Sequence, residues 1–193
     1  MCAVFLNSGK HLAFGSRDFK IYVFDVSTGR LVTKLVGHDA SVCSISNLGS
    51  FFVSGGDNGC NSIIIWDSNS WKIKRKIVSV HKAAVSCILD FGDGTNFATG
   101  GYDKLINIFN YQKGDSAFSL NSNRSAICAL AWNSHNKKMI SAGLDQTLTI
   151  WTAFFLNGIV SDFSLERIIT SVGLVCSMQS LSLAYDCFVI GNK

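Results

Sequence analysis

The sequence contains no proline, and only 16% of its 193 residues are charged. Without proline the chain cannot carry a proline-rich linker or a polyproline recognition tail. Apolar residues make up 48% of the chain, which excludes a largely disordered protein and is enough for a sizeable core. The net charge of +4 is compatible with contact to nucleic acid or anionic lipid but requires neither.

Long apolar runs and a leader sequence are also missing. Apolar runs such as 153–156 span only a few residues, whereas a membrane helix needs roughly 20, so we expect no membrane insertion. The opening residues, MCAVFLNSGK, lack the charged and long apolar regions of a secretory signal. We therefore expect a cytoplasmic protein, with the nucleus as the alternative location, whose cysteines are free thiols.

Motifs for several common chemistries are absent as well. The sequence has no Cys-x-x-Cys pair with histidines at zinc-ligand spacing, no glycine-rich phosphate loop, no H-E-x-x-H and no kinase signature. We therefore expect no metal site and no cofactor.

What the sequence does have is a repeat. Aromatic residues recur at intervals of 42, 43 and 42 residues, at Phe24, Trp66, Phe109 and Trp151. A polar residue precedes three of them by 28 residues, at His38, His81 and Asn123. An aspartate precedes three of them by six residues, at Asp18, Asp103 and Asp145. A period of about 40–45 residues is typical of the blades of a β-propeller.

Each repeat unit contains four short strand-like segments. Between residues 85 and 120 these are VSCILDF, TNFATG, LINIFNY and SAFSL, each bounded by Gly, Asp or Asn. No unit contains an apolar run with helical spacing. Because a four-stranded sheet cannot cover both of its faces alone, stacking such sheets around an axis is the expected solution. The sequence therefore predicts an all-β propeller of four-stranded antiparallel blades.

The pattern GH…SGG…WD at this spacing resembles the WD-repeat family of β-propellers, and the resemblance covers essentially the whole chain. It implies a single domain, 1–193, of about four and a half blades, an incomplete piece of a ring that most often has seven. The units are approximately 1–36 (partial), 37–80, 81–122, 123–170 and 171–193 (partial). We expect either a piece of a longer propeller, a truncated gene model, or a chain completed by a partner. A ring closed by this chain alone is the less expected case.

The resemblance also implies a buried hydrogen-bond chain in each unit: a His before the first strand (a), a hydroxyl on strand b, an Asp in the b–c turn and a Trp on strand c. The second unit offers His38, Ser54, Asp57 and Trp66. The third offers His81, Thr99 and Asp103, with Phe109 at the aromatic position. The fourth offers Asn123, Ser141, Asp145 and Trp151. The first has only Asp18 and Phe24, with Phe14 at the hydroxyl position.

Three departures from this pattern matter. Phe24 and Phe109 lack a ring N–H, so the first and third units cannot close the chain at that end, and we expect them to be less rigid. Asp57 lies nine residues before Trp66 instead of six, so we expect it to miss its usual position. Ser, His and Asp together could suggest a hydrolase, but a catalytic set occurs once, whereas this one recurs with the blade period. We therefore interpret these residues as structural and expect no enzyme.

The fourth unit contains an extra segment. From Trp151 to Val175 the chain runs 24 residues, compared with 19 and 18 in the two preceding units. The sequence LTIWTAFFL, then Asn157-Gly158, then IVSDFSL predicts a hairpin. Two interpretations stay open: a docking element carrying Phe154 and Phe155, or simply a longer strand pair.

The function we expect is a non-catalytic scaffold that presents its loops to other proteins. The predicted partner contacts precede the turn aspartates or follow the histidine positions: Arg17, Tyr102, Leu144, Lys82 and Arg124. Partners beyond other proteins include the remaining blades of a larger propeller or a complementing chain.

The alternative function is an RNA- or ribonucleoprotein-associated propeller. It depends on WKIKRKI at residues 71–77, where strand alternation places Lys72, Lys74 and Lys76 on one side. Such a stripe is more often a charged edge that discourages strand addition, and it lacks the interleaved aromatics of a single-strand binder.

Overall fold

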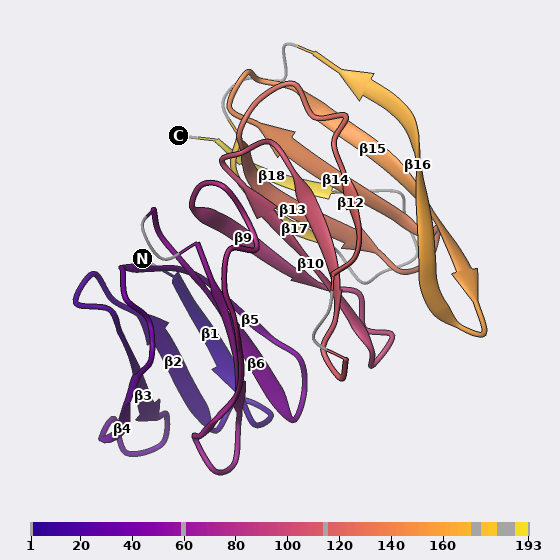
Figure 1. The fold of residues 1–193 in the computed structure, drawn as a ribbon. Helices are drawn as coiled ribbons and strands as arrows, with labels where there is room; N and C mark the ends of the chain where they lie inside the picture. Colours follow the sequence, from indigo (N-terminus) through magenta and orange to yellow (C-terminus); the bar gives the residue numbers. More distant parts are fainter. Residues whose placement is uncertain (1, 59–60, 114–115, 171–174, 181–187, 193) are drawn as a thin grey trace. The chain divides into compact units, whose positions relative to one another are not determined.

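The computed structural model describes residues 2–58, 61–113, 116–170, 175–180 and 188–192 (Figure 1). All regular elements in these residues are β-strands, arranged as four antiparallel four-stranded sheets and one two-stranded sheet. The prediction of an all-β fold with four-stranded antiparallel blades is confirmed. No helix able to span a bilayer occurs in the described part of the chain.

The strand order within every four-stranded sheet follows the sequence. Sheet one, the first unit, contains β1 (Cys2–Leu6), β2 (His11–Gly15), β3 (Lys20–Asp25) and β4 (Leu31–Val36). Sheet two contains β5 (Val42–Asn47), β6 (Phe51–Gly56), β7 (Ile63–Asp67) and β8 (Ile73–Ile77). The first unit, expected to be partial, thus has all four strands.

Sheets three and four repeat this arrangement. Sheet three contains β9 (Val85–Asp90), β10 (Asn96–Gly101), β11 (Ile106–Asn110) and β12 (Ser116–Leu120), at the positions predicted from the sequence. Sheet four contains β13 (Ile127–Asn133), β14 (Lys138–Gly143), β15 (Leu148–Leu156) and β16 (Ile159–Ile169). The fifth unit contributes β17 (Val175–Ser180) and β18 (Phe188–Asn192).

The chain divides into two compact parts, residues 1–88 and 89–193. The core of the first part lies between sheets one and two. Sheet one contributes Leu6, Ala13, Ile21, Val23 and Leu35, and sheet two contributes Val42, Phe52, Ile64 and Trp66. Because side chains alternate between the two faces of a strand, each sheet gives its neighbour one complete apolar face.

Glycine at the end of strand b allows the next unit to approach. A Cβ atom on Gly15 would lie 2.6 Å from Cγ1 of Val42, the first residue of β5. A Cβ atom on Gly55 would lie 2.8 Å from Cβ of Val85, the first residue of β9. The Gly residues of the repeat therefore set how closely strand a of one unit packs on strand b of the unit before it.

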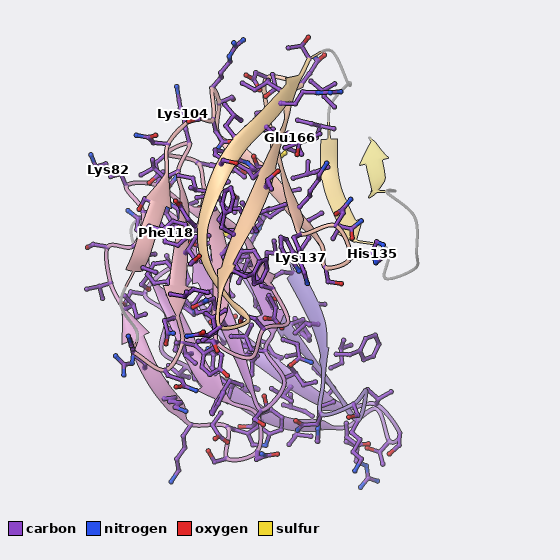
Figure 2. All side chains as sticks on the ribbon, turned by 90° about the vertical axis from the view of Figure 1, so that its right-hand side faces the viewer. Lys82, Lys104, Phe118, His135, Lys137 and Glu166 are labelled. Carbon is purple, nitrogen blue, oxygen red and sulfur yellow. The ribbon has the colours of Figure 1, made fainter. Side chains whose placement is uncertain are left out.

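In the second part, the β15–β16 hairpin is anchored on sheet three. Asn157 and Gly158 both have positive φ, 53° and 77°, as the predicted Asn-Gly turn requires. The ring of Phe163 lies 5.6 Å from that of Phe91 and 6.1 Å from that of Phe118. On the same strand, Glu166 accepts hydrogen bonds from Lys138 and Thr152 on the neighbouring strands (Figure 2).

The backbone of Val160 strengthens this anchor. Its N–H donates to Oδ2 of Asp93 at 3.3 Å, and its carbonyl accepts a hydrogen bond from Nδ2 of Asn96 at 3.2 Å. Phe155 packs on Trp132, with ring centroids 6.2 Å apart, whereas Phe154 is 52% exposed. Of the two phenylalanines considered for docking, only Phe154 thus faces solvent.

We predict that Phe163→Ala lowers the free energy of unfolding by roughly 3–5 kcal/mol, because it opens a cavity among packed aromatic rings. Leu165→Ala, on the same strand but 44% exposed, is the control and should change it by less than about 1 kcal/mol. Urea unfolding followed by tryptophan fluorescence measures both values. Equal losses in the two variants would contradict the anchoring role of Phe163.

Candidate functional site

The hydrogen-bond chain of unit two is centred on Ser54. Its Oγ lies 2.6 Å from Nε2 of His38 and accepts a hydrogen bond from Nε1–H of Trp66 at 2.8 Å. None of the three residues is more than 5% exposed. One hydroxyl on β6 thus ties the segment before β5 to the aromatic residue of β7.

The His38 ring is held in its neutral form. Burial lowers the pKa of His38 to about 4, the Lys76 ammonium lowers it further, and Asp39 opposes this shift. Lys76 in turn donates hydrogen bonds to the carbonyl of Gly37 and to the Asp39 carboxylate, both at 2.7 Å. A neutral ring can share a hydrogen bond with Ser54 without an uncompensated buried charge.

Unit four builds the same chain with an amide in place of the imidazole. Ser141 Oγ donates to Oδ1 of Asn123 at 2.7 Å and accepts from Nε1–H of Trp151 at 3.0 Å. Among the described residues, Nδ2 of Asn123 is a buried donor with no hydrogen-bond acceptor. The chain is therefore shorter than in unit two but uses the same central hydroxyl.

Units one and three use aromatic packing at the same place. Phe14 stacks between Tyr22 and Phe24, with ring centroids 5.2 Å and 5.6 Å away. In unit three Phe97 stacks on Phe109 at 5.5 Å. Thr99 Oγ1 donates to the carbonyl of Asn107 at 3.4 Å, and His81 is buried.

The turn aspartates of units one, three and four shape the b–c turns. Each accepts a hydrogen bond from the residue two positions later: Lys20 N at 3.4 Å, Leu105 N at 3.2 Å and Thr147 Oγ1 at 2.7 Å. The residue after each aspartate has positive φ: Phe19, Lys104 and Gln146. This is the three-residue hairpin loop whose last residue is left-handed.

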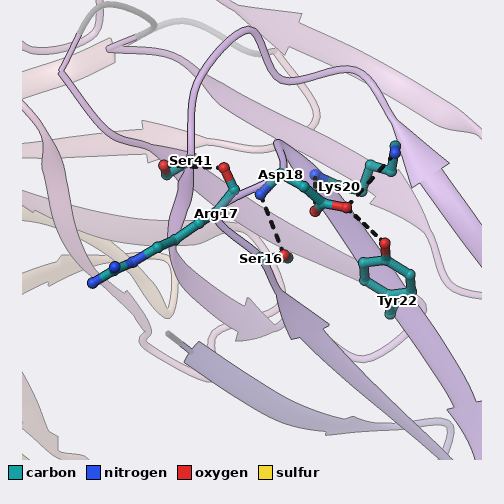
Figure 3. A network of polar contacts seen from close by, with 6 residues as sticks. All are labelled: Ser16, Arg17, Asp18, Lys20, Tyr22 and Ser41. Carbon is teal, nitrogen blue, oxygen red and sulfur yellow. Dashed lines mark hydrogen bonds and ion pairs between the residues drawn. The ribbon is translucent and has the colours of Figure 1, made fainter.

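Figure 3 shows this arrangement in unit one. The Asp18 carboxylate accepts a hydrogen bond from the Tyr22 hydroxyl at 2.6 Å and lies 3.6 Å from Nζ of Lys20. The hydrogen bonds from Tyr22 and then Ser16 lower the pKa of Asp18 to about 2. The Arg17 side chain points away from this network, and its carbonyl accepts a hydrogen bond from Ser41 Oγ at 3.5 Å.

Asp57 lies elsewhere in its turn. Its N–H donates to the carbonyl of Ser41 at 2.8 Å, as the N–H of Leu144 donates to Ala126 at 3.0 Å in unit four. Asp57 thus occupies the position of Leu144 and not that of Asp145, which corrects its assignment to the hydrogen-bond chain. The cause is a longer b–c turn, closed by a hydrogen bond from Gly56 N to Ser62 O. Burial first, and then the Asp57 carboxylate, raise the pKa of the Cys43 thiol to about 11.

The predicted contact residues are all exposed at the end of their own sheet where the b–c turn and the d–a connection lie. Arg17 and Lys82 belong to the first compact part, and Tyr102, Arg124 and Leu144 to the second. Tyr102 and Leu144 are 48% and 45% exposed although their turns are fixed by the hydrogen bonds above.

Sequence reasoning missed Phe19, which is 47% exposed with φ of 72°. A bulky residue in the left-handed region is strained, and such strain is often found at functional positions. The signal in the sequence was an aromatic residue directly after a turn aspartate, where the other two turns have Lys104 and Gln146.

Comparison with known proteins matches the chain to the family described as "WD domain, G-beta repeat" over residues 29–67, 72–110 and 114–152. Among similar proteins, the COMPASS component SWD3 of Saccharomyces cerevisiae is 28% identical over 74% of this chain and 48% of its own length. Actin-interacting protein 1 of Caenorhabditis elegans is 25% identical over 80% of this chain and 26% of its own. WD repeat-containing protein srw1 of Schizosaccharomyces pombe is 24% identical over 74% of this chain and 26% of its own. The chain therefore spans between a quarter and a half of the length of these relatives.

We predict that Ser54→Ala lowers the free energy of unfolding by roughly 2–4 kcal/mol, because the buried Trp66 N–H loses its acceptor and His38 loses a hydrogen bond. Ser50→Ala, an exposed serine one strand end away, should change it by less than about 0.5 kcal/mol. Urea unfolding measures both variants. A Ser54→Ala protein as stable as the control would show that the chain contributes nothing.

The pKa of His38 also predicts an acid dependence. The unfolded ring takes up a proton near pH 6.5, whereas the folded ring stays neutral down to about pH 4. The contribution of His38 is therefore present above pH 6.5 and is lost as the pH falls towards 4. We expect the free energy of unfolding to fall by about 2 kcal/mol between about pH 7.5 and about pH 5.

His38→Asn is the matched variant, because Asn123 fills the equivalent place in unit four. Its unfolding free energy should depend less on pH over this range, by the same amount. Parallel pH dependences for wild type and variant would assign the acid sensitivity to another group.

Proposed function

This chain is a member of the WD-repeat family, and we propose that it is a non-catalytic scaffold that presents the turns of its sheets to partner proteins. The observation that carries the proposal is the exposure of Arg17, Phe19, Tyr102 and Leu144 on turns held by backbone and aspartate hydrogen bonds. Aromatic and arginine side chains on a fixed backbone are the usual anchors of protein interfaces. The relatives named as a complex component and as an actin-interacting protein support a role in binding.

The repeated Ser, His and Asp residues support a structural role over catalysis. Ser54 and Ser141 are at most 1% exposed, and each hydroxyl already accepts a hydrogen bond from an indole N–H. A nucleophile needs access to substrate and a base that can take its proton. The raised pKa of Cys43 likewise favours the unreactive thiol over the thiolate.

An RNA-associated role has less support. On β8 the ammonium of Lys74 lies 3.6 Å from the ring centroid of Phe51, and that of Lys76 is bound by Asp39 and Gly37. Two of the three lysines that suggested an anion-binding stripe therefore have partners within the chain. A filter-binding titration separates the two functions: a steep loss of RNA affinity with added salt would favour the RNA role.

The remaining parts of the proposal concern the whole protein. Because the chain spans only part of its relatives, the identity of the partner, further blades or a complementing chain belong to proposals about that whole. A cytoplasmic location, with the nucleus as the alternative, stays a prediction that imaging of the tagged protein would test.

The triple variant Arg17→Ala, Lys82→Ala, Tyr102→Ala should lose captured partners in an affinity pull-down, because it removes the anchors from the b–c and d–a segments. The matched control replaces three exposed residues of the a–b and c–d turns, Lys10, Val26 and Asn69, with alanine. Quantitative mass spectrometry compares the two captures with wild type. An unchanged partner set in the triple variant would exclude this end of the sheets as the binding surface.

A further inference from the structure

Three sheets bury one particular face almost completely. This face carries the strand b hydroxyl position, the strand c aromatic position and the residue two places before each of them. In unit two these are Phe52, Ser54, Ile64 and Trp66; in unit three Phe97, Thr99, Asn107 and Phe109; in unit four Met139, Ser141, Thr149 and Trp151. None of these twelve residues is more than 4% exposed.

The same face of unit one is open. Its equivalent residues are Leu12, Phe14, Tyr22 and Phe24, and all four are only half-buried. The register places Phe5 opposite Leu12, and Val36 at the end of β4 opposite Lys20, on the same face. Phe5 is 59% and Val36 67% exposed. We call these six residues, Phe5, Leu12, Phe14, Tyr22, Phe24 and Val36, the open face.

The chain itself shows what covers such a face. In unit two, Phe52, Ile64 and Trp66 pack against the other side of sheet one, which presents only aliphatic side chains: Leu6, Ala13, Ile21, Val23 and Leu35. The complement of the open face is therefore the aliphatic side of another four-stranded sheet. Packing an aromatic sheet face on an aliphatic one also fits the close approach between stacked sheets.

Sheet four exposes part of such an aliphatic side. Leu148 and Ile150 stand three and one residues before Trp151, as Ile21 and Val23 stand before Phe24. Contacts with β17 lie on β13, at the far edge of this sheet from β16. On β15 and β16, Ile150 is half-buried, Phe154 is 52% exposed, and Ile169, opposite Leu148, is 37% exposed. We call Ile150, Phe154 and Ile169 the aliphatic face.

We infer that the open face of one chain binds the aliphatic face of a second copy, so that the protein associates head to tail. The chain carries both members of a complementary pair, and the packing of sheet one on sheet two supplies the template. A contiguous exposed apolar surface of this kind usually marks an interaction site. A pair of different surfaces gives a heterologous contact, which extends until the ends meet.

Charges at the margins predict the salt response. Lys34 lies opposite Tyr22 at the outer edge of the open face, and Arg167 lies opposite Ile150 at the outer edge of the aliphatic face. Two cations at the rim of one apolar contact repel each other, and salt screens that repulsion. Association should therefore strengthen as salt is added, in contrast to binding that depends on opposite charges.

The experiment is sedimentation velocity on the whole chain over a range of concentrations. Wild type should show a mass that rises with concentration above the 21.0 kDa of the monomer. The open-face variant Phe5→Glu, Val36→Glu and the aliphatic-face variant Phe154→Glu, Ile169→Glu should each remain monomeric. All four residues are exposed, so the substitutions leave the core intact, and circular dichroism checks the fold. The control Tyr102→Glu, Leu144→Glu, with similar exposure but on the turns, should associate like wild type.

Mixing the two monomeric variants tests the pairing itself. Each variant keeps one intact face, so an equimolar mixture should form a dimer that grows no further. Wild type that stays monomeric at every concentration would overturn the inference. So would a mixture without dimer, or an aliphatic-face variant that still associates, since the open face would then pair with itself or with another partner. These residues are not the turn residues of the proposed scaffold, so either proposal can fail while the other stands.

Discussion

The structure depends on one constraint: a four-stranded sheet has two faces, and neither is stable in water unless another layer covers it. Sheets one and two meet this constraint by packing an aliphatic side on an aromatic one, from Ala13 and Val23 to Phe52 and Trp66. Glycine at position 15 or 55 lets the next unit approach, because a Cβ there would collide with Val42 or Val85. The repeat in the sequence is thus the record of a packing interface used again and again.

Polar groups that lie inside this interface must be satisfied there. The hydroxyl of Ser54 serves an indole and an imidazole at once, and that of Ser141 serves an indole and an amide. These chains fix the sheet ends from which the b–c turns project, and the turn aspartates fix the turns themselves. The residues that resemble a catalytic set therefore act at a distance from the surface that meets partners: they hold the backbone, and exposed side chains such as Tyr102 make the contacts.

The period of the repeat predicted the strands, the antiparallel sheets and the Asn157-Gly158 turn, because these depend on local pattern. It also identified Ser54 and Ser141, whose partners recur at fixed spacing. It could not place Asp57, since a longer turn changes the register without changing the residue type. The anchoring of Phe163 on Phe91 and Phe118 joins segments that are far apart in sequence, so no single window contains it. The open side of sheet one was likewise invisible, because its residues are as apolar as those of a covered face.

The composition of that open side has its own logic. A hydrogen-bond chain such as that of Ser54 needs a permanent cover, because partial exposure would let water compete for each of its bonds. Phe14, stacked between Tyr22 and Phe24, keeps its contacts whether or not another layer lies above it, and burial leaves no polar atom of Phe14 or Phe24 unsatisfied. Units with a polar chain are thus committed to a fixed neighbour, whereas unit one can exist both covered and uncovered. The replacement of Ser by Phe at this position is therefore suited to a face whose cover is acquired by association.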